Sequence, residues 1–481
     1  MRDLLTLSLI LMMLLVVVFM VVRRHSSSLA SSIKSALARR LRQPAIVIKD
    51  RATAHRLLVR GCVGGSFSNR PASLAPTAVV SHLRHHNLTT APYGPFWRVT
   101  RRNLTPEVLH PLRLHSYAAA RRDALAGLVA DLGEQCTTSP DGLVLAAESI
   151  RNAMFGLLAT MCFGEGVDKG LVRAMADAHE FVQFFPELRF FAKLPAVARM
   201  IYRKRWSKLV ALRQKQEDMY LPLIHTRRTR QRQSGELPAY VDTLIDLWVQ
   251  DEHNAYDGNV RKRRRRQRRL ADGEIVGMCA EFVGAGTETV AAELQWGEPG
   301  ETPTRAGGRP EGDRRCREHG HRGGRRGGSW EARVPQRCRP GGAPATPHRD
   351  LGGEAGTNVL FRPESLARDK TAWANPDDFR PERFLPRRGG ESVNLVAAAG
   401  SSGGEMRMLP FGAGRRVCPG MGVAMLHMGY FMSNLVKEFE WREAEGELAV
   451  DLRPHFGFFT VMKRPLRARL FAYKRPKGGV N

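Results

Sequence analysis

The chain has 481 residues, enough for one large enzyme or two to three ordinary domains, and 43% of them are hydrophobic, as in an ordinary globular protein. Its formal net charge of +28 would by itself suggest an anionic partner. The seven cysteines are odd in number and scattered, which argues for a reducing, cytosol-facing compartment. The composition therefore excludes a small secreted domain held together by disulfides.

The first predicted element is an apolar run at residues 4–22, interrupted only by two hydroxyl residues. A helix needs about 20 such residues to span a bilayer. Two arginines and a histidine follow at once, and no small-residue cleavage site is present. Because more positive charge lies behind the span than before it, residues 1–25 are predicted to be an uncleaved single-pass anchor with the bulk of the chain facing the cytosol.

The chain beyond the anchor is predicted to be rich in helices. A strand is predicted at 44–48 and a helix at 51–59. Trp97 and Arg101 are four residues apart, so they share one face of a helix. Further amphipathic helices are predicted at 117–132, 142–163 and 203–220.

Residues 261–269 hold eight basic residues in nine. Such a run could bind nucleic acid, but no aromatic residues are interleaved to stack on bases. A solvated loop is the favoured interpretation, and no nucleic-acid partner is predicted.

A long apolar helix is predicted at 272–296, or about 37 Å at 1.5 Å per residue. Within it the stretch A-G-T-E-T runs from Ala285 to Thr289. Glu288 and Thr289 offer an acid and a hydroxyl side by side, which suits proton delivery. Gly286 is expected to allow a local widening of the helix. The alternative is a polar patch on a surface helix.

The character of the chain changes abruptly after this helix. Residues 297–350 contain no Leu, Ile, Phe, Met or Tyr, whereas 12 Arg, 12 Gly and 7 Pro make up more than half of them. Because this composition cannot bury a core, the segment 297–365 is predicted to be disordered or an out-of-frame reading of the gene.

One cysteine lies in a glycine-rich stretch near the C-terminal end. The ten residues from Phe411 to Gly420 read F-G-A-G-R-R-V-C-P-G, and an amphipathic helix is predicted after them. A thiolate such as that of Cys418 is a strong ligand for haem iron. Gly414 suits backbone lying against a flat macrocycle, and Arg416 offers a fork of donors for a propionate. The alternative is a buried structural cysteine in a turn.

The pattern F-x-x-G-x-R-x-C-x-G resembles the haem-binding loop of the cytochrome P-450 monooxygenases. The A-G-T-E-T stretch, the W-x-x-x-R spacing and a P-E-R-F run at 381–384 resemble other motifs of that family. The resemblance covers 44–296 and 366–472 as a single domain, and it is closest to plant microsomal members. It implies a mainly α fold with small β-sheets, preceded by the transmembrane helix.

The resemblance also implies a function. The chain would bind haem b and insert one atom of O₂ into a small, apolar organic substrate, taking electrons from a flavoprotein reductase that uses NADPH. It would sit in the endoplasmic reticulum membrane with its catalytic domain facing the cytosol. By the resemblance Cys418 is the metal ligand, and Glu288 and Thr289 deliver protons. The implied cofactor-binding residues are Cys418, Phe411, Gly414, Arg416, Gly420, Trp97, Arg101, Ala285 and Gly286.

One departure from the family leaves a second interpretation open. The family carries an E-x-x-R pair on a helix before the P-E-R-F run. Glu311 and Arg314 fit that pair literally, but they lie within the Arg/Gly/Pro-rich segment with no helical pattern around them. The alternative is therefore an inactive product of a gene that is frameshifted or whose reading frame is wrongly assigned.

Overall fold

The structure is a computed structural model, and it describes most of the chain in separate stretches. The described residues are 45–60, 67–70, 87–139, 142–179, 199–250 except 201, 233–235 and 237, 267–296, 358–377, 406–443, 453–456 and 460–473. The predicted anchor at 1–25, the P-E-R-F run and most of segment 297–365 lie outside them.

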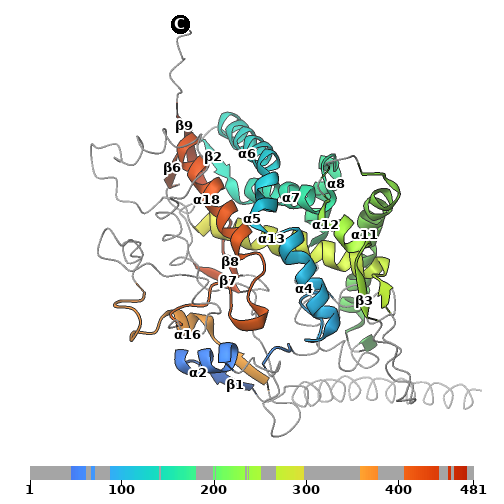
Figure 1. Cartoon of the computed structure of the whole chain (residues 1–481). Coiled ribbons are helices and arrows are strands. Elements are labelled where there is room, and N and C mark those ends of the chain that lie inside the picture. Colours follow the sequence, from blue (N-terminus) through green and yellow to red (C-terminus); the bar gives the residue numbers. More distant parts are fainter. Residues whose placement is uncertain are drawn as a thin grey trace, which may run out of the picture.

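Helices form most of the described chain (Figure 1). The α-helices are α2 (Arg51–His55), α4 (Pro95–Glu107), α5 (Pro111–Ser116), α6 (Ala118–Thr138), α7 (Ala146–Phe163), α8 (Lys169–Ala178), α11 (Arg203–Thr229), α12 (Tyr240–Ile245), α13 (Asp272–Trp296), α16 (Pro363–Ala367) and α18 (Met421–Glu438), with a π-helical turn η1 (Arg56–Arg60) and a 3₁₀ turn η7 (Gly414–Arg416). The helices predicted at 117–132, 203–220 and 272–296 are confirmed. The helix predicted to begin at residue 142 begins at Ala146 instead, because the residues before it form a strand.

The strands of the described residues make four small sheets. The strands are β1 (Ala45–Ile48), β2 (Leu143–Leu145), β3 (Trp248–Gln250), β4 (Gln267–Arg269), β5 (Asn358–Phe361), β6 (Phe439–Glu443), β7 (Pro454–Phe456), β8 (Thr460–Met462) and β9 (Arg467–Ala472). Strand β1 pairs in parallel with β5, and the antiparallel pairs are β3 with β4 and β7 with β8. Strand β9 lies between β2 and β6, antiparallel to both. Residues 358–365, which were expected to belong to the disordered or out-of-frame segment, include β5 and the start of α16.

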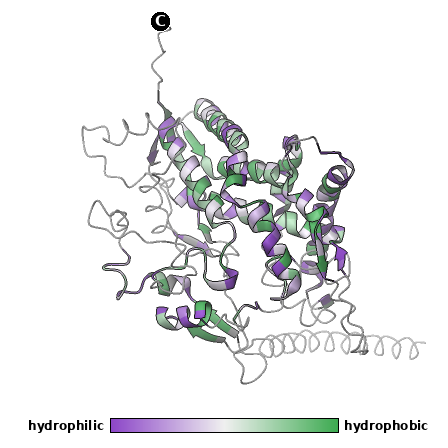
Figure 2. Ribbon diagram, viewed as in Figure 1, coloured by the Kyte–Doolittle hydropathy of each residue, from purple (hydrophilic) through white to green (hydrophobic). Residues whose placement is uncertain are grey.

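Helix α13 is the central element of the main hydrophobic core. It packs against α7, α11 and α18, and buried apolar residues of all four helices belong to one hydrophobic cluster. Figure 2 shows hydrophobic and hydrophilic residues interspersed along these helices. Two acids in its first turn, Asp272 and Glu274, complement the positive end of the helix dipole. Among the described helices, α13 alone is long and apolar enough to cross a membrane, and 72% of its apolar window is buried, so it is a core helix here.

A second hydrophobic cluster supports the start of the cysteine stretch. It joins α2 and η1 to β5, α16 and the residues just before η7. Arg51 Nε lies 2.7 Å from Asp369 Oδ2, and Arg51 Nη1 donates to the Met406 carbonyl at 3.2 Å. This cluster therefore ties the N-terminal part of the described chain to the loop that carries Cys418.

Candidate functional site

The stretch around Cys418 forms a closed loop. The Cys418 N–H donates to the Phe411 carbonyl, with 2.8 Å between nitrogen and oxygen. Gly412 and Gly414 have φ angles of 72° and 68°, a region that other residues rarely adopt. Phe411 packs against the main core, and Gly420 is the N-cap residue, immediately before α18 begins at Met421. The glycines and the phenylalanine therefore hold the cysteine at the entrance of α18, as predicted.

The Cys418 thiol is half-buried. Burial raises the pKa of this thiol, whereas the Gly420 N–H, Arg101 and Arg70 oppose that rise. A Cβ atom added to Gly420 would lie 3.9 Å from the cysteine sulfur, so the glycine backbone lies close to it. The surroundings of Cys418 are therefore apolar, but they also include groups that favour the thiolate form of the cysteine when a cation is bound to its sulfur.

Three arginines gather next to Cys418. Arg101 Nη2 donates to the Val417 carbonyl at 2.6 Å. Burial, followed by the nearby charge of Arg70, lowers the pKa of Arg416 to about 9, and Arg101 acts in the same direction. Cations that disfavour one another in this way favour the binding of anionic groups.

Arg416 is buried, and its guanidinium contacts three carbonyl groups. Its Nε, Nη1 and Nη2 atoms donate to the carbonyls of Ser68, Leu88 and Ala91 at 2.8, 3.0 and 2.7 Å. A guanidinium has five N–H donors, so two remain for another acceptor.

Trp97 on α4 packs against two of the arginines. The Arg416 guanidinium is 4.6 Å and that of Arg101 5.9 Å from the indole ring centroid. The ring is 5% exposed, yet its Nε1 has no hydrogen-bond partner among the described residues. A buried donor without an acceptor is costly, so this N–H marks a place for an external acceptor.

The residues of the A-G-T-E-T stretch lie on different faces of α13. Ala285 is exposed in an otherwise buried part of the helix, and Thr289 Oγ1 donates to its carbonyl at 2.8 Å. Glu288 turns instead to α7, where its Oε1 lies 2.8 Å from Arg151 Nε. The two residues predicted to act side by side therefore have different surroundings, and the carboxylate is held in an ion pair.

Gly286 serves the packing of two helices and not the predicted local widening of α13. The helix is α-helical throughout Asp272–Trp296, so the expected widening is absent from it. A Cβ atom at Gly286 would lie 2.8 Å from Leu158 Cδ1 on α7. The glycine therefore allows α7 and α13 to approach each other closely.

Sequence reasoning missed Glu281, which lies one helical turn before Ala285. Its Oε2 and Oε1 atoms accept hydrogen bonds from the N–H groups of Leu88 and Thr89, both at 2.8 Å. Burial raises the pKa of this carboxyl, against the effect of its hydrogen bonds. The sequence feature that could have indicated Glu281 is its position as a single acidic residue within an apolar run. Arg70 and Arg151 were also missed, and neither lies in a pattern that would single it out.

The residues of this site fit a haem group. The arginines and the free indole N–H suit two propionates, and the Cys418 sulfur is the soft ligand that iron binds. The exposed Ala285 next to Thr289 leaves a small, apolar position on α13.

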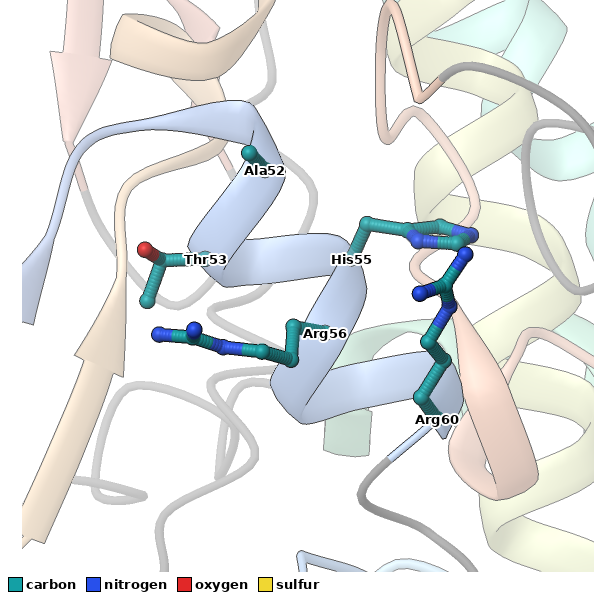
Figure 3. A pocket seen from close by; sticks show the side chains of 5 residues that line it. All are labelled: Ala52, Thr53, His55, Arg56 and Arg60. Atoms are coloured by element: carbon teal, nitrogen blue, oxygen red, sulfur yellow. The ribbon is translucent and has the colours of Figure 1, made fainter.

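A separate cavity of about 310 Å³ lies beside α2 and η1. It is lined by Ala52, Thr53, His55, Arg56 and Arg60. The side chains of His55 and Arg60 lie next to each other, while Arg56 and Thr53 lie on the opposite side of the helix (Figure 3). None of the predicted site residues lines it.

Comparisons with known proteins give a consistent result. A family model described as Cytochrome P450 matches residues 37–297 and 353–468. Cytochrome P450 89A9 of Arabidopsis thaliana is 33% identical over 460 residues, covering 90% of this chain and 85% of the relative. Tryptamine 5-hydroxylase of Oryza sativa subsp. japonica is 27% identical over 451 residues, covering 88% and 81%. A zebra fish cytochrome P450 structure with progesterone superposes with a TM-score of 0.61 at 17% identity, covering 89% of this chain and 93% of that one.

Proposed function

Because the chain belongs to the cytochrome P450 family of monooxygenases, we propose that it binds haem b through Cys418 and inserts one atom of O₂ into a small, apolar organic substrate. The observation that carries the proposal is the setting of Cys418 near Arg101, whose guanidinium also lies over the Trp97 ring, together with the indole N–H of Trp97, which lacks an acceptor among the described residues. A haem held by the Cys418 thiolate would supply the activation of O₂.

The residues around the site would divide the remaining work. Trp97, Arg101 and Arg416 would bind the propionates and orient the macrocycle. The Thr289 hydroxyl, on the exposed face of α13, would donate a proton at its Oγ1 atom. The Glu288 carboxylate, held by Arg151, would take up a proton from solvent water and return it to that hydroxyl.

The electrons would come from an NADPH-dependent flavoprotein reductase, and the chain would sit in the endoplasmic reticulum membrane through residues 1–25. The apolar run at 4–22 supports this location, and the family generally works with a reductase.

A reduced, carbon-monoxide difference spectrum of the full chain tests the proposal. A Soret band at the red-shifted position of a thiolate-ligated haem is expected. It should be lost in Cys418→Ser and kept in Cys136→Ser, which changes a half-buried thiol on α6. A band that persists in Cys418→Ser would contradict the assignment of the ligand.

One observation favours a second candidate, an inactive product of a frameshifted gene. The family match stops at residue 297 and resumes at 353, and the Arg/Gly/Pro-rich residues lie between. If this candidate is correct, the chain as written takes up no haem. Replacing residues 298–352 with the corresponding stretch of the Arabidopsis relative should then restore the spectrum.

A further inference from the structure

The turn at residues 87–91 is held from two sides. Its Leu88 and Thr89 N–H groups donate to the Glu281 carboxylate of α13, both at 2.8 Å. Its Leu88 and Ala91 carbonyls accept from Arg416 of the cysteine loop, at 3.0 and 2.7 Å. The turn therefore connects the central helix to the loop that carries Cys418.

The turn is also closed internally. Its first residue, Asn87, is 6% exposed, and its side-chain Oδ1 accepts from the N–H of Thr90 at 2.9 Å and from the Thr90 hydroxyl at 2.7 Å. The Ala91 N–H donates to the Asn87 carbonyl at 2.9 Å. A turn fixed in this way transmits a displacement at one side to the other.

A carboxylate suits the Glu281 position because both of its oxygens accept hydrogen bonds. A glutamine there would have one accepting oxygen and one donating NH₂ group, so it would match only one of the two N–H groups. The negative charge of Glu281 also opposes the lowering of the Arg416 pKa.

We propose that Glu281 is a positioning residue of this site: by holding the turn at 87–91 it places the Arg416 guanidinium over Trp97 and next to Cys418. The contacts stand without a cofactor, and their role in haem retention rests on the function proposed above. The Glu281 side chain acts through the turn: its described hydrogen bonds are with the N–H groups of Leu88 and Thr89, and none of them is with Cys418.

Hydrogen–deuterium exchange of the full chain tests this without relying on activity. Glu281→Gln should speed amide exchange about tenfold in peptides covering both 87–91 and 411–418, because two hydrogen bonds to a charged group are weakened. Asn87→Ala loosens the same turn without changing any charge, and it should speed exchange in the same two peptides.

Glu274→Gln is the matched control. Glu274 is a buried carboxylate of the same helix that also accepts a backbone hydrogen bond, from the Ala271 N–H at 2.9 Å. Glu274→Gln should speed amide exchange around residues 267–275 only. Exchange that rises at 87–91 in Glu281→Gln while 411–418 stays unchanged would overturn the proposal, and so would an equal effect of Glu274→Gln on the cysteine loop.

Haem retention separates this inference from the proposed function. If the wild-type chain takes up haem, Glu281→Gln and Asn87→Ala should both lower the amount retained and the thiolate band, whereas Glu274→Gln should keep both. Full retention in the first two variants would overturn the role in the haem pocket. If the wild-type chain takes up no haem, the proposed function fails, while the exchange result still decides whether Glu281 positions Arg416.

Discussion

Arg151 of α7 and Glu288 of α13 form an ion pair with 2.8 Å between Nε and Oε1, although they are 137 residues apart in the sequence. The two side chains are 30% and 18% exposed, so the pair is partly shielded from water. Arg151 also donates from Nη2 to the Ala176 carbonyl, at 2.6 Å, which joins α8 to the pair. The acid of the A-G-T-E-T stretch is therefore fixed by a cation on a neighbouring helix.

A double-mutant cycle measures the interaction free energy between Arg151 and Glu288. Arg151→Gln and Glu288→Gln should each lower the free energy of unfolding by about 1 kcal/mol, and the double variant should lose less than the sum. The measurement is denaturant unfolding of the four proteins under identical conditions. Strictly additive losses would show that the two side chains do not interact in solution.

Thr289→Ala should reduce product formation about 100-fold, because the variant lacks the hydroxyl proposed to deliver a proton. The fold should survive, since Thr289 Oγ1 bonds to the Ala285 carbonyl of its own helix. Product formed per NADPH oxidised is the quantity to measure with a reductase present. Thr289→Ser keeps the hydroxyl and is the control; an equal loss in both variants would refute the role.

Trp97→Phe should have opposite effects on the haem-free and haem-bound protein. It keeps a buried ring but removes an N–H that has no partner among the described residues, so the haem-free chain should gain about 1 kcal/mol of stability. Haem should bind more weakly, because a propionate donor is lost. Thermal unfolding and haem titration measure the two effects. Trp373→Phe, which removes a bond from Nε1 to the Arg407 carbonyl, should only destabilise.

The glycines of α13 provide a packing test. Gly286→Ala should destabilise the fold by about 1–3 kcal/mol, because its Cβ would lie 2.8 Å from Leu158 Cδ1. Gly284→Ala should cost more, since its Cβ would overlap the His179 ring. Gly127→Ala on α6 meets nothing within 4 Å, and it should stabilise by about 0.5–1 kcal/mol. Unfolding midpoints in denaturant rank the three; a stabilising Gly286→Ala would contradict the close contact.

Stability should fall in acid because of two buried histidines. Burial lowers the pKa of both His179 and His427 to about 3, from an ordinary 6.5. Between these values the unfolded chain binds a proton that the native state excludes, so stability is full above pH 6.5 and is lost as the pH falls toward 3. The slope should be about 1.4 kcal/mol per pH unit for each histidine.

His427→Leu checks this pH dependence. The His427 Nε2 atom is buried and has no partner among the described residues, so leucine should be tolerated at neutral pH. The variant should reduce the slope of unfolding free energy between about pH 4 and 6 by the contribution of one proton. An unchanged slope would mean that His427 is protonated in the native state.

The sequence predicted those parts of the fold that depend on local patterns. The helix at 272–296 was predicted to its ends, because apolar periodicity begins after Asp272 and Gly297 follows Trp296. The cysteine loop was located from a ten-residue window in which Gly412 and Gly414 adopt positive φ, whereas Gly420 has a φ of −86°. The mainly helical fold with small sheets followed from the same reasoning and from the family resemblance.

The features that the sequence did not predict depend on distant partners. Strand β2 was taken for the start of a helix, because its pairing with β9 joins residues such as Leu143 and Arg469. The ion pair of Glu288, the contact of Gly286 with Leu158 and the turn held by Glu281 all involve a second segment more than 100 residues away. Periodicity and spacing report one segment at a time, so they contain no information on such partners.

The pairing of β1 with β5 has a consequence for synthesis of the protein on the ribosome. Ala45 aligns with Asn358, so at about 5–20 residues per second β1 waits about 15–60 seconds for its partner strand. Ile46 and Val47 remain 45% and 41% exposed even in the finished sheet. During translation this apolar strand edge would be open to chaperones and to other nascent chains until the residues of β5 have been synthesised.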